Sequence, residues 1–302
     1  MTIAVTGGTG FVGRSLLEVA ADRGREVRAL ARRPQAPLAG VDWIAGDLAD
    51  REALRDLVAG VEAVIHVAGV VNGPDAAAFE AGNVAGTLAL IEAAIAAGVP
   101  RFVFVSSLSA REPGLSAYGR SKAKAEKLVK ASGLDWTIVR PPAIYGPRDR
   151  EMFELFRSAK WGVIPTPKEG RASLIHVHDL ARLLTALIPL GERVSHRTLE
   201  PDDGKRGGWE HYELARAIDW AVGRRPKVLP LSKRTMEWAA KVDGVLRGTR
   251  AKLTLDRVGY LTHPDWVVGH GSRIPAELWR PQIETREGLR ATAQWYREQG
   301  WL

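Results

Sequence analysis

A glycine-rich turn near the N-terminus constrains the fold of this chain more than any other feature. The apolar residues Ile3-Ala4-Val5 lead into Thr6-Gly7-Gly8-Thr9-Gly10-Phe11-Val12-Gly13, and the amphipathic segment after them ends at Gly24. This order predicts a strand, a tight turn and a helix whose N-terminal N–H groups bind an anion. Gly7 permits the turn, Gly10 leaves room for a pyrophosphate, and Gly13 lets the helix approach the sheet. We therefore expect a dinucleotide site over residues 7–13.

Strand and helix patterns alternate through the first half of the chain. Strands are expected at residues 27–31, 41–45, 61–68, 101–105 and 136–139, and helices at 51–59, 76–97 and 117–131. Near-continuous apolar strands are typical of a parallel sheet covered on both faces. The alternation predicts an α/β fold, a Rossmann-type doubly wound parallel sheet. Ligands of such sheets bind at the carboxyl ends of the strands.

After Pro141 and Pro142 the pattern becomes irregular. We expect one return to the sheet near residues 173–177, then helices at 178–187, 209–222 and 232–246. This divides the chain into an NAD(P)-binding domain, residues 1–145 with the return at 173–187, and a smaller, mostly helical substrate lobe, residues 146–302. The apolar side chains early in the lobe suit either a substrate lining or core packing, and packing is favoured: Met152, Phe153, Phe156 and Trp161.

Composition narrows the possible functions. Among 302 residues there is no cysteine, which excludes disulfides, thiolate catalysis and cysteine metal sites. No run of about 18 apolar residues predicts a membrane span, and the immediate strand leaves no room for a signal peptide, so the cytoplasm is the default. Most of the net charge of +8 lies in residues 224–252, with nine Lys or Arg against two acids. A solvated helix face is favoured there over nucleic acid, and peripheral contact of residues 232–246 with an anionic membrane stays open.

Tyr118 and Lys122 are the strongest candidates for chemistry. They stand four residues apart on an expected helix, so both side chains project from one face. An ammonium beside a phenol favours the phenolate and lowers the pKa of the tyrosine from about 10. The tyrosine could then exchange a proton with a substrate oxygen near neutral pH. Ser107, at the end of the strand over 101–105, could hold the same oxygen.

With these motifs in order, the chain resembles the extended short-chain dehydrogenases/reductases, the group that includes nucleotide-sugar epimerases and dehydratases. The matching segments extend over about residues 1–185: the glycine turn, Gly46-Asp47-Leu48, His66-Val67-Ala68-Gly69, Asn83, Ser106-Ser107, Tyr118-Gly119-Arg120-Ser121-Lys122, Arg140-Pro141-Pro142-Ala143-Ile144-Tyr145-Gly146-Pro147 and Ile175-His176-Val177-His178-Asp179-Leu180-Ala181.

The resemblance implies a role for each matching residue. Tyr118 would be the general acid/base, Lys122 would hold the nicotinamide ribose, and Ser107, rather than Ser106, would polarise the substrate oxygen. Asn83 would steady the helix behind the catalytic group. The remaining cofactor contacts would come from Asp47 and Leu48 at the adenine, from Val67, Ala68 and Gly69 along the cofactor, and from Pro141 and Ile144. His66 and His176 are expected to be structural.

Cofactor choice follows from the end of the second strand. NAD needs an acid there to bind the ribose hydroxyls, but the sequence has Leu30-Ala31-Arg32-Arg33 and no acid before Asp42. Arg32 and Arg33, with Arg14 assisting, could instead bind a 2′-phosphate through their guanidinium groups. We expect NADP(H) to be preferred, with NAD(H) possible.

Three functions remain open from the sequence. The first is an NADP-dependent oxidoreductase acting on a carbonyl or secondary alcohol of a small-molecule substrate, through Ser107, Tyr118 and Lys122. The second is an epimerase or dehydratase acting on a nucleotide sugar with retained NAD(P). The third is a non-catalytic NADP-binding subunit or sensor at a membrane complex, which the intact Tyr118 and Lys122 disfavour. The resemblance also suggests a homodimer formed through the helices over 76–97 and 117–131.

Overall fold

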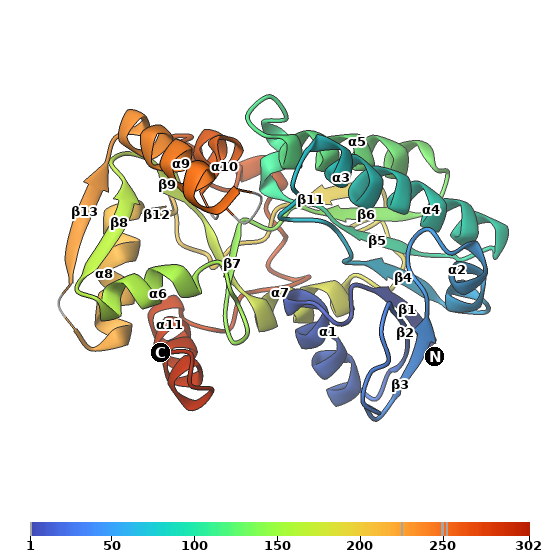
Figure 1. Cartoon of the computed structure of the whole chain (residues 1–302). Helices are drawn as coiled ribbons and strands as arrows, with labels where there is room; N and C mark the ends of the chain where they lie inside the picture. Colours follow the sequence, from blue (N-terminus) through green and yellow to red (C-terminus); the bar gives the residue numbers. More distant parts are fainter. Residues whose placement is uncertain (1, 225, 249–250, 252) are drawn as a thin grey trace. The chain divides into compact units, whose positions relative to one another are not determined.

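A seven-stranded parallel sheet forms the centre of the first of two compact units. The computed structural model describes residues 2–224, 226–248, 251 and 253–302 (Figure 1). The sheet has the order β11-β6-β5-β4-β1-β2-β3. Its strands are β1 Thr2–Thr6, β2 Glu26–Ala31, β3 Val41–Ala45, β4 Ala63–His66, β5 Phe102–Val105, β6 Trp136–Val139 and β11 Arg197–Leu199. The order reverses between β1 and β4, so a ligand site is expected at the carboxyl ends of these two strands. The predicted Rossmann-type fold is confirmed.

Helices cover both faces of this sheet, as expected for parallel strands that are apolar throughout. They are α1 Phe11–Asp22, α2 Arg51–Val58, α3 Ala76–Phe79, α4 Gly86–Ala96, α5 Ala117–Ala131 and α7 Val177–Ala186. Side chains of α2, α4 and α5 bury one face of the sheet in a common core, around Leu54, Leu90 and Val129. On the opposite face lie α1 and α7 (Figure 1), where Arg23 Nη1 donates to Thr185 Oγ1 at 2.5 Å.

The helix predicted over residues 76–97 contains a π-helical turn. Between α3 and α4 the segment η1, Glu80–Ala85, forms this turn, and Asn83 within it is buried. By length and composition alone, Ala76–Ala96 is apolar enough to cross a membrane. This corrects the expectation that no segment would pass that test. One face of α4, with Leu90 and Ile91, is buried against α2 and the sheet, whereas Leu88 and Ile95 are exposed.

The seventh strand is not the one that the sequence predicts. Residues 174–176 do form a strand, β10 Leu174–His176, but it pairs with β7, Ala143–Tyr145, in a separate two-stranded sheet. The strand that joins the large sheet is β11, beside β6. The predicted return near 173–177 is therefore wrong. The chain comes back through α7 and β11 instead, and residues His178–Pro201 belong to the first unit.

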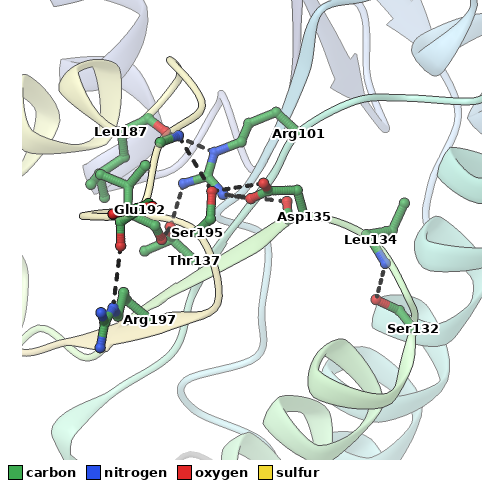
Figure 2. Close-up of polar contacts among 11 residues, drawn as sticks. Arg101, Ser132, Leu134, Asp135, Thr137, Leu187, Glu192, Ser195 and Arg197 are labelled. Atoms are coloured by element: carbon green, nitrogen blue, oxygen red, sulfur yellow. Dashed lines mark hydrogen bonds and ion pairs between the residues drawn. The ribbon is translucent and has the colours of Figure 1, made fainter.

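A buried arginine holds β11 in place. Arg101, 1% exposed, donates from Nε to the Leu187 carbonyl at 3.0 Å and from Nη1 to Asp135 Oδ1 at 2.5 Å, and it also contacts Thr137 Oγ1 (Figure 2). Ser195 Oγ donates to the second oxygen of Asp135 at 2.7 Å. The network thus joins the starts of β5 and β6 to the segment between α7 and β11. These contacts position β11, which has only three residues and no strongly apolar sequence of its own.

The second unit consists of Pro142–Val177, Asp202–His270 and Pro281–Leu302. Its helices are α6 Phe153–Lys160, α8 His211–Val222, α9 Lys233–Arg247, α10 Leu255–Leu261 and α11 Thr285–Glu298. Besides β7 and β10, it has the pair β8 Val163–Pro167 with β13 Lys227–Leu231, and the triple β9 Arg171–Ala172, β12 Trp209–Glu210 and β14 Asp265–Trp266. Met152 and Phe156 are buried in its core, as the packing interpretation predicts, whereas Trp161 is 82% exposed. Of the basic stretch, residues 225, 249, 250 and 252 lie outside the described residues; the helix predicted over 232–246 is α9.

Candidate active site

The glycine turn after β1 has the geometry of a phosphate site. Gly7 has a φ of 76°, and its carbonyl accepts the N–H of Gly10 at 2.9 Å. A Cβ on Gly13 would lie 2.0 Å from the Gly7 oxygen, so the close start of α1 requires glycine. A Cβ on Gly10 would meet only that same oxygen, at 3.3 Å. Internal packing therefore leaves the side of Gly10 open, and the residue fits a ligand that approaches the backbone closely.

The first turn of α1 is open to an anion. Its N-cap is Gly10, no side chain caps it, and its first turn carries no acid. The leading N–H groups of a helix have no partner within the helix and form the positive end of its dipole. These features fit the pyrophosphate of a dinucleotide, which would lie over the turn with Thr9 and Gly10 exposed beside it.

The segment after β4 lies directly against this turn. The N–H of Val67 donates to the Thr6 carbonyl and that of Ala68 to Thr6 Oγ1, both at 3.2 Å. A Cβ on Gly7 would come within 2.6 Å of the Ala68 nitrogen. Residues 67–69, predicted to line the cofactor, are thus brought to the glycine turn at the point where the strand order reverses.

His66, at the end of β4, is structural, as expected. It is fully buried, and its ring nitrogens contact Thr6 Oγ1 at 2.6 Å and Thr87 Oγ1 at 2.9 Å. Because Thr87 donates its own proton to the Asn83 carbonyl, the hydrogen-bond network assigns the ring proton to Nε2. Burial, with the charge of Lys122, lowers the pKa of His66 to about 3. The neutral ring therefore connects the glycine-turn strand to the π-helical turn.

Asn83 links three parts of the site. Its Oδ1 accepts the N–H of Val70 at 2.6 Å, and its Nδ2 donates to the Val70 carbonyl and to Ser121 Oγ, both at 2.9 Å. The Ser121 hydroxyl in turn donates to the carbonyl of Tyr118 at 2.8 Å. One buried amide thus connects the loop after β4 with the first turn of α5. The supporting role that the family resemblance implies for Asn83 stays a prediction.

Lys122 is buried one turn beyond Tyr118 on α5. Its Nζ donates to the Val105 carbonyl at 2.7 Å and lies 4.5 Å from the centre of the Phe104 ring. Burial lowers the pKa of Lys122 to about 8, although Glu126 partly offsets this. Tyr118 is half-buried, with its ring centre 6.1 Å from that of Phe79. The lysine ammonium is therefore held at the carboxyl end of β5, just before the two candidate serines.

The two serines after β5 have different surroundings. Ser106 Oγ donates to Glu126 Oε1 at 2.6 Å and is buried. Ser107 Oγ instead accepts twice from Ser109, from its N–H at 3.2 Å and from its hydroxyl at 2.9 Å. Those two bonds occupy the lone pairs of Ser107 and leave its own proton for another acceptor. The difference favours Ser107 as the donor to a substrate oxygen.

A buried ion network supports these residues, and the sequence analysis missed it. Glu126, 3% exposed, accepts two bonds from Arg140, from Nε at 2.8 Å and from Nη2 at 2.6 Å. Arg140 also meets Glu200, at 3.4 Å. Glu126 follows Lys122 by four residues and so shares its inward face of α5. A carboxylate at an inward helix position is a sequence signal for a buried partner.

The remaining predicted contacts are distributed as follows. Arg32 and Arg33 are exposed just after β2, and neither guanidinium has a hydrogen bond or ion pair within the described residues. Asp47 is exposed and accepts the N–H of Ala49, while Leu48 packs against the core of the first unit. Pro141 is the last residue of the first segment of that unit, and its carbonyl accepts the N–H of Leu108. Ile144 lies on β7 in the second unit, so its predicted cofactor contact stays a prediction.

Comparisons with known proteins agree with this geometry. Residues 3–198 match the model of the NAD dependent epimerase/dehydratase family. A ceramide reductase of Caulobacter vibrioides is 38% identical over 99% of this chain and 96% of its own length. A sterol demethylase protein B of Methylococcus capsulatus is 31% identical over the whole of both chains. Among solved structures, MoeE5 in complex with UDP-glucuronic acid and NAD has a TM-score of 0.76 at 24% identity, covering 99% of this chain and all of the other.

These findings leave no place for the non-catalytic alternative. The chain belongs to the NAD dependent epimerase/dehydratase family and is an NAD(P)-dependent enzyme of the extended short-chain dehydrogenase/reductase type.

Proposed function

We propose that this enzyme uses NADPH to reduce a ketone on a long-chain, lipid-type substrate to a secondary alcohol. The observation that carries the proposal is the 38% identity to a ceramide reductase, which extends over 99% of the chain. The relative with full coverage of both chains, a sterol demethylase protein, is also named for a lipid. A ceramide-class substrate would present its ketone on an oxidised carbon of the chain, because an amide carbonyl is a poor hydride acceptor.

The chain's own residues suit the proton side of this reaction. The bound dinucleotide would supply a hydride to the carbonyl carbon and leave oxidised. Ser107 would donate its free proton in a hydrogen bond to the ketone oxygen, and Tyr118 would transfer the proton that completes the alcohol. Lys122 would stabilise the phenolate left on Tyr118 until solvent returns the proton. Asn83, through Ser121, would keep the first turn of α5 in register.

A Tyr118→Phe variant tests the catalytic assignment. We expect turnover to be abolished and the NADPH dissociation constant to change less than about threefold, because a single phenol proton is lost and no phosphate contact is removed. Tyr212→Phe alters an exposed tyrosine of α8 and serves as the matched control. Stopped assays of ketone loss and a fluorescence titration measure the two quantities. A Tyr118→Phe protein with most of its activity would contradict the assignment.

An Arg32→Ala variant tests the cofactor preference. Arg32 follows β2 with a free guanidinium and no acid beside it, which supports binding of a 2′-phosphate. Loss of a charge-assisted hydrogen bond of about 1.5–3 kcal/mol should weaken NADPH binding by roughly 10- to 150-fold and leave NADH binding nearly unchanged. Arg51→Ala, another exposed arginine of the same unit, is the control. Equal loss for both cofactors would show that the phosphate is recognised elsewhere.

The second candidate is an epimerase or dehydratase acting on a nucleotide sugar. The family name and the similarity of the fold to that of MoeE5 support it. Net cofactor consumption separates the two functions. The purified enzyme is incubated with NADPH and a long-chain ketone of the ceramide class in detergent, and in parallel with UDP-glucose. One NADPH oxidised for each ketone lost supports the reductase. Conversion of the sugar with no change in NADPH would overturn it.

A further inference from the structure

The outward face of α9 is apolar, although no described residue of the chain covers it. Trp238 is 68% exposed, Val245 87% and Leu246 77%. On the same helix Met236 and Ala240 are buried in a small cluster with Val258 of α10, beside which α9 lies (Figure 1). Residues 238, 242 and 245 recur at helical spacing on the side opposite 236 and 240. The helix therefore has two apolar faces, and the described part of the chain covers only the one with Met236 and Ala240.

Cations border this uncovered face. Lys233, Arg234 and Lys241 are all exposed and form no ion pair within the described residues. Viewed down the helix axis, Arg234 and Lys241 lie on the same side as Val245, within about 100° of it. The acid Asp243 is already engaged, accepting the N–H of Leu253 at 2.9 Å and pairing with Arg247 at 3.2 Å. Glu237, the other acid of α9, stands four residues before Lys241 on the same flank. Arg234 and Lys241 outnumber it, so the net charge beside the apolar stripe is positive.

We propose that this face, defined by Trp238, Val242, Val245 and Leu246 with Arg234 and Lys241 beside them, binds the surface of an anionic lipid bilayer. Helices that lie in a membrane interface have this composition, with a large apolar stripe bordered by Lys and Arg. Tryptophan is enriched at that depth because its ring is apolar and its N–H polar. Each basic residue near an anionic surface adds further attraction.

The same composition argues against a second copy of the chain as the occupant. The centre of a protein–protein interface is depleted of charged residues, and lysine is among those most strongly excluded. Here Lys241 stands one helical turn from Val245 and Arg234 one turn from Trp238, rather than at a distant rim. A bilayer accepts both features, since headgroups pair with the cations while the acyl boundary covers the stripe.

This surface goes beyond the proposed reductase activity and does not depend on it. Docking at a membrane would bring the enzyme to the phase in which a lipid ketone is dissolved. The binding itself needs neither cofactor nor turnover, so it is tested without them. A failure of the docking proposal therefore leaves the reductase assignment standing, and the reverse also holds.

The test is co-sedimentation of the full-length protein with vesicles of phosphatidylcholine alone or with 30% phosphatidylglycerol. We expect binding to the anionic vesicles, at least 10-fold weaker binding to the neutral ones, and weaker binding as salt is raised. Val245→Asp/Leu246→Asp should reduce binding by roughly 100-fold, because two exposed apolar side chains can no longer be buried. Leu190→Asp makes the same change at an exposed leucine of the first unit and should bind as the unaltered protein does.

A second variant keeps the result interpretable if the double aspartate protein does not fold. Arg234→Glu/Lys241→Glu leaves the apolar stripe intact and should remove the preference for anionic vesicles. Sedimentation velocity is run on the same proteins. No binding to anionic vesicles, or unchanged binding by either variant, would overturn the proposal. So would a dimer that the Val245→Asp/Leu246→Asp change converts to monomer, because the face would then be a protein interface.

Discussion

Lys122→Met should change how the stability of the first unit depends on pH. The side chain of Lys122 is 4% exposed, and its ammonium is held by the Val105 carbonyl at 2.7 Å. Burial lowers the pKa of Lys122 from its usual 10.5 to about 8. Between pH 8 and 10.5 the unfolded chain binds a proton that the folded protein does not. The free energy of unfolding therefore rises with pH across this window, and below pH 8 the full cost of the buried charge is present.

The magnitude follows from the two pKa values. At pH 7 the buried charge lowers the free energy of unfolding by about 3 kcal/mol relative to a side chain that does not titrate, and at pH 9.5 by about 1 kcal/mol. Lys122→Met removes the charge but keeps a side chain of similar length. The difference in unfolding free energy between the variant and the unaltered enzyme should therefore shrink by about 2 kcal/mol between pH 7 and pH 9.5.

The assay is urea unfolding without cofactor at pH 7.0, 8.5 and 9.5. A spectroscopic signal from the whole molecule would mix the transitions of the two compact units. Unfolding in urea is therefore followed by hydrogen exchange of the peptide that carries β5. Lys124→Met removes an exposed lysine of the same helix and is the matched control. The reasoning would be refuted if the difference in unfolding free energy between Lys122→Met and the unaltered enzyme changed by less than about 0.5 kcal/mol between pH 7 and pH 9.5.

Two further predictions concern the first unit. Arg101→Met should destabilise it by about 3 kcal/mol, because the carboxylate of Asp135 and the Leu187 carbonyl lose their buried donor; thermal unfolding measures this, and a variant with no change in its transition would show that the network contributes little. Gly13→Ala should abolish NADPH binding, because its Cβ would lie 2.0 Å from the Gly7 oxygen and α1 must shift. Quenching of tryptophan fluorescence by NADPH reports the loss, and tight binding by this variant would contradict it.

The first unit was largely predictable from the sequence because its information is local. Strands that are buried on both faces are apolar throughout, and each is separated from the next by a periodic helix. The strand that was misplaced shows the limit of such patterns. β11 is a three-residue strand, and its position depends on Arg101, which lies about a hundred residues earlier in the sequence. The more apolar β10 is the better strand by composition, yet it pairs with β7.

The π-helical turn was not predictable for a different reason. The alanine-rich run from 76 to 96 favours the ordinary α-helix locally, and no side chain in it signals a π-helical turn. The turn places Asn83 inward, where it bonds to both polar groups of Val70. It also lets Thr87, four residues later, contact His66. Tertiary hydrogen bonds therefore favour the π-helical turn, a feature that is frequent at functional sites.

The choice between Ser106 and Ser107 came from the family resemblance, and the structure supplies a physical cause. Glu126 accepts the Ser106 proton, and Arg140, at the end of β6, donates to both oxygens of the same carboxylate. Three elements must meet before the difference between the serines exists. The spacing of residues within β5, α5 or β6 alone therefore does not predict the difference between Ser106 and Ser107.

The proposed proton chemistry and the proposed substrate class rest on different parts of the chain, and therefore on different comparisons. The family model matches residues 3–198 and so covers the glycine turn, Tyr118 and Lys122, but it stops before most of the second unit. In that unit β9, β12 and β14 have two residues each and come from positions about 40 to 90 apart, which leaves no local signal for prediction. The ceramide reductase remains 38% identical over 99% of the chain, the second unit included. Family membership therefore supports hydride and proton transfer, whereas the nature of the substrate is argued from the relative that also matches beyond residue 198.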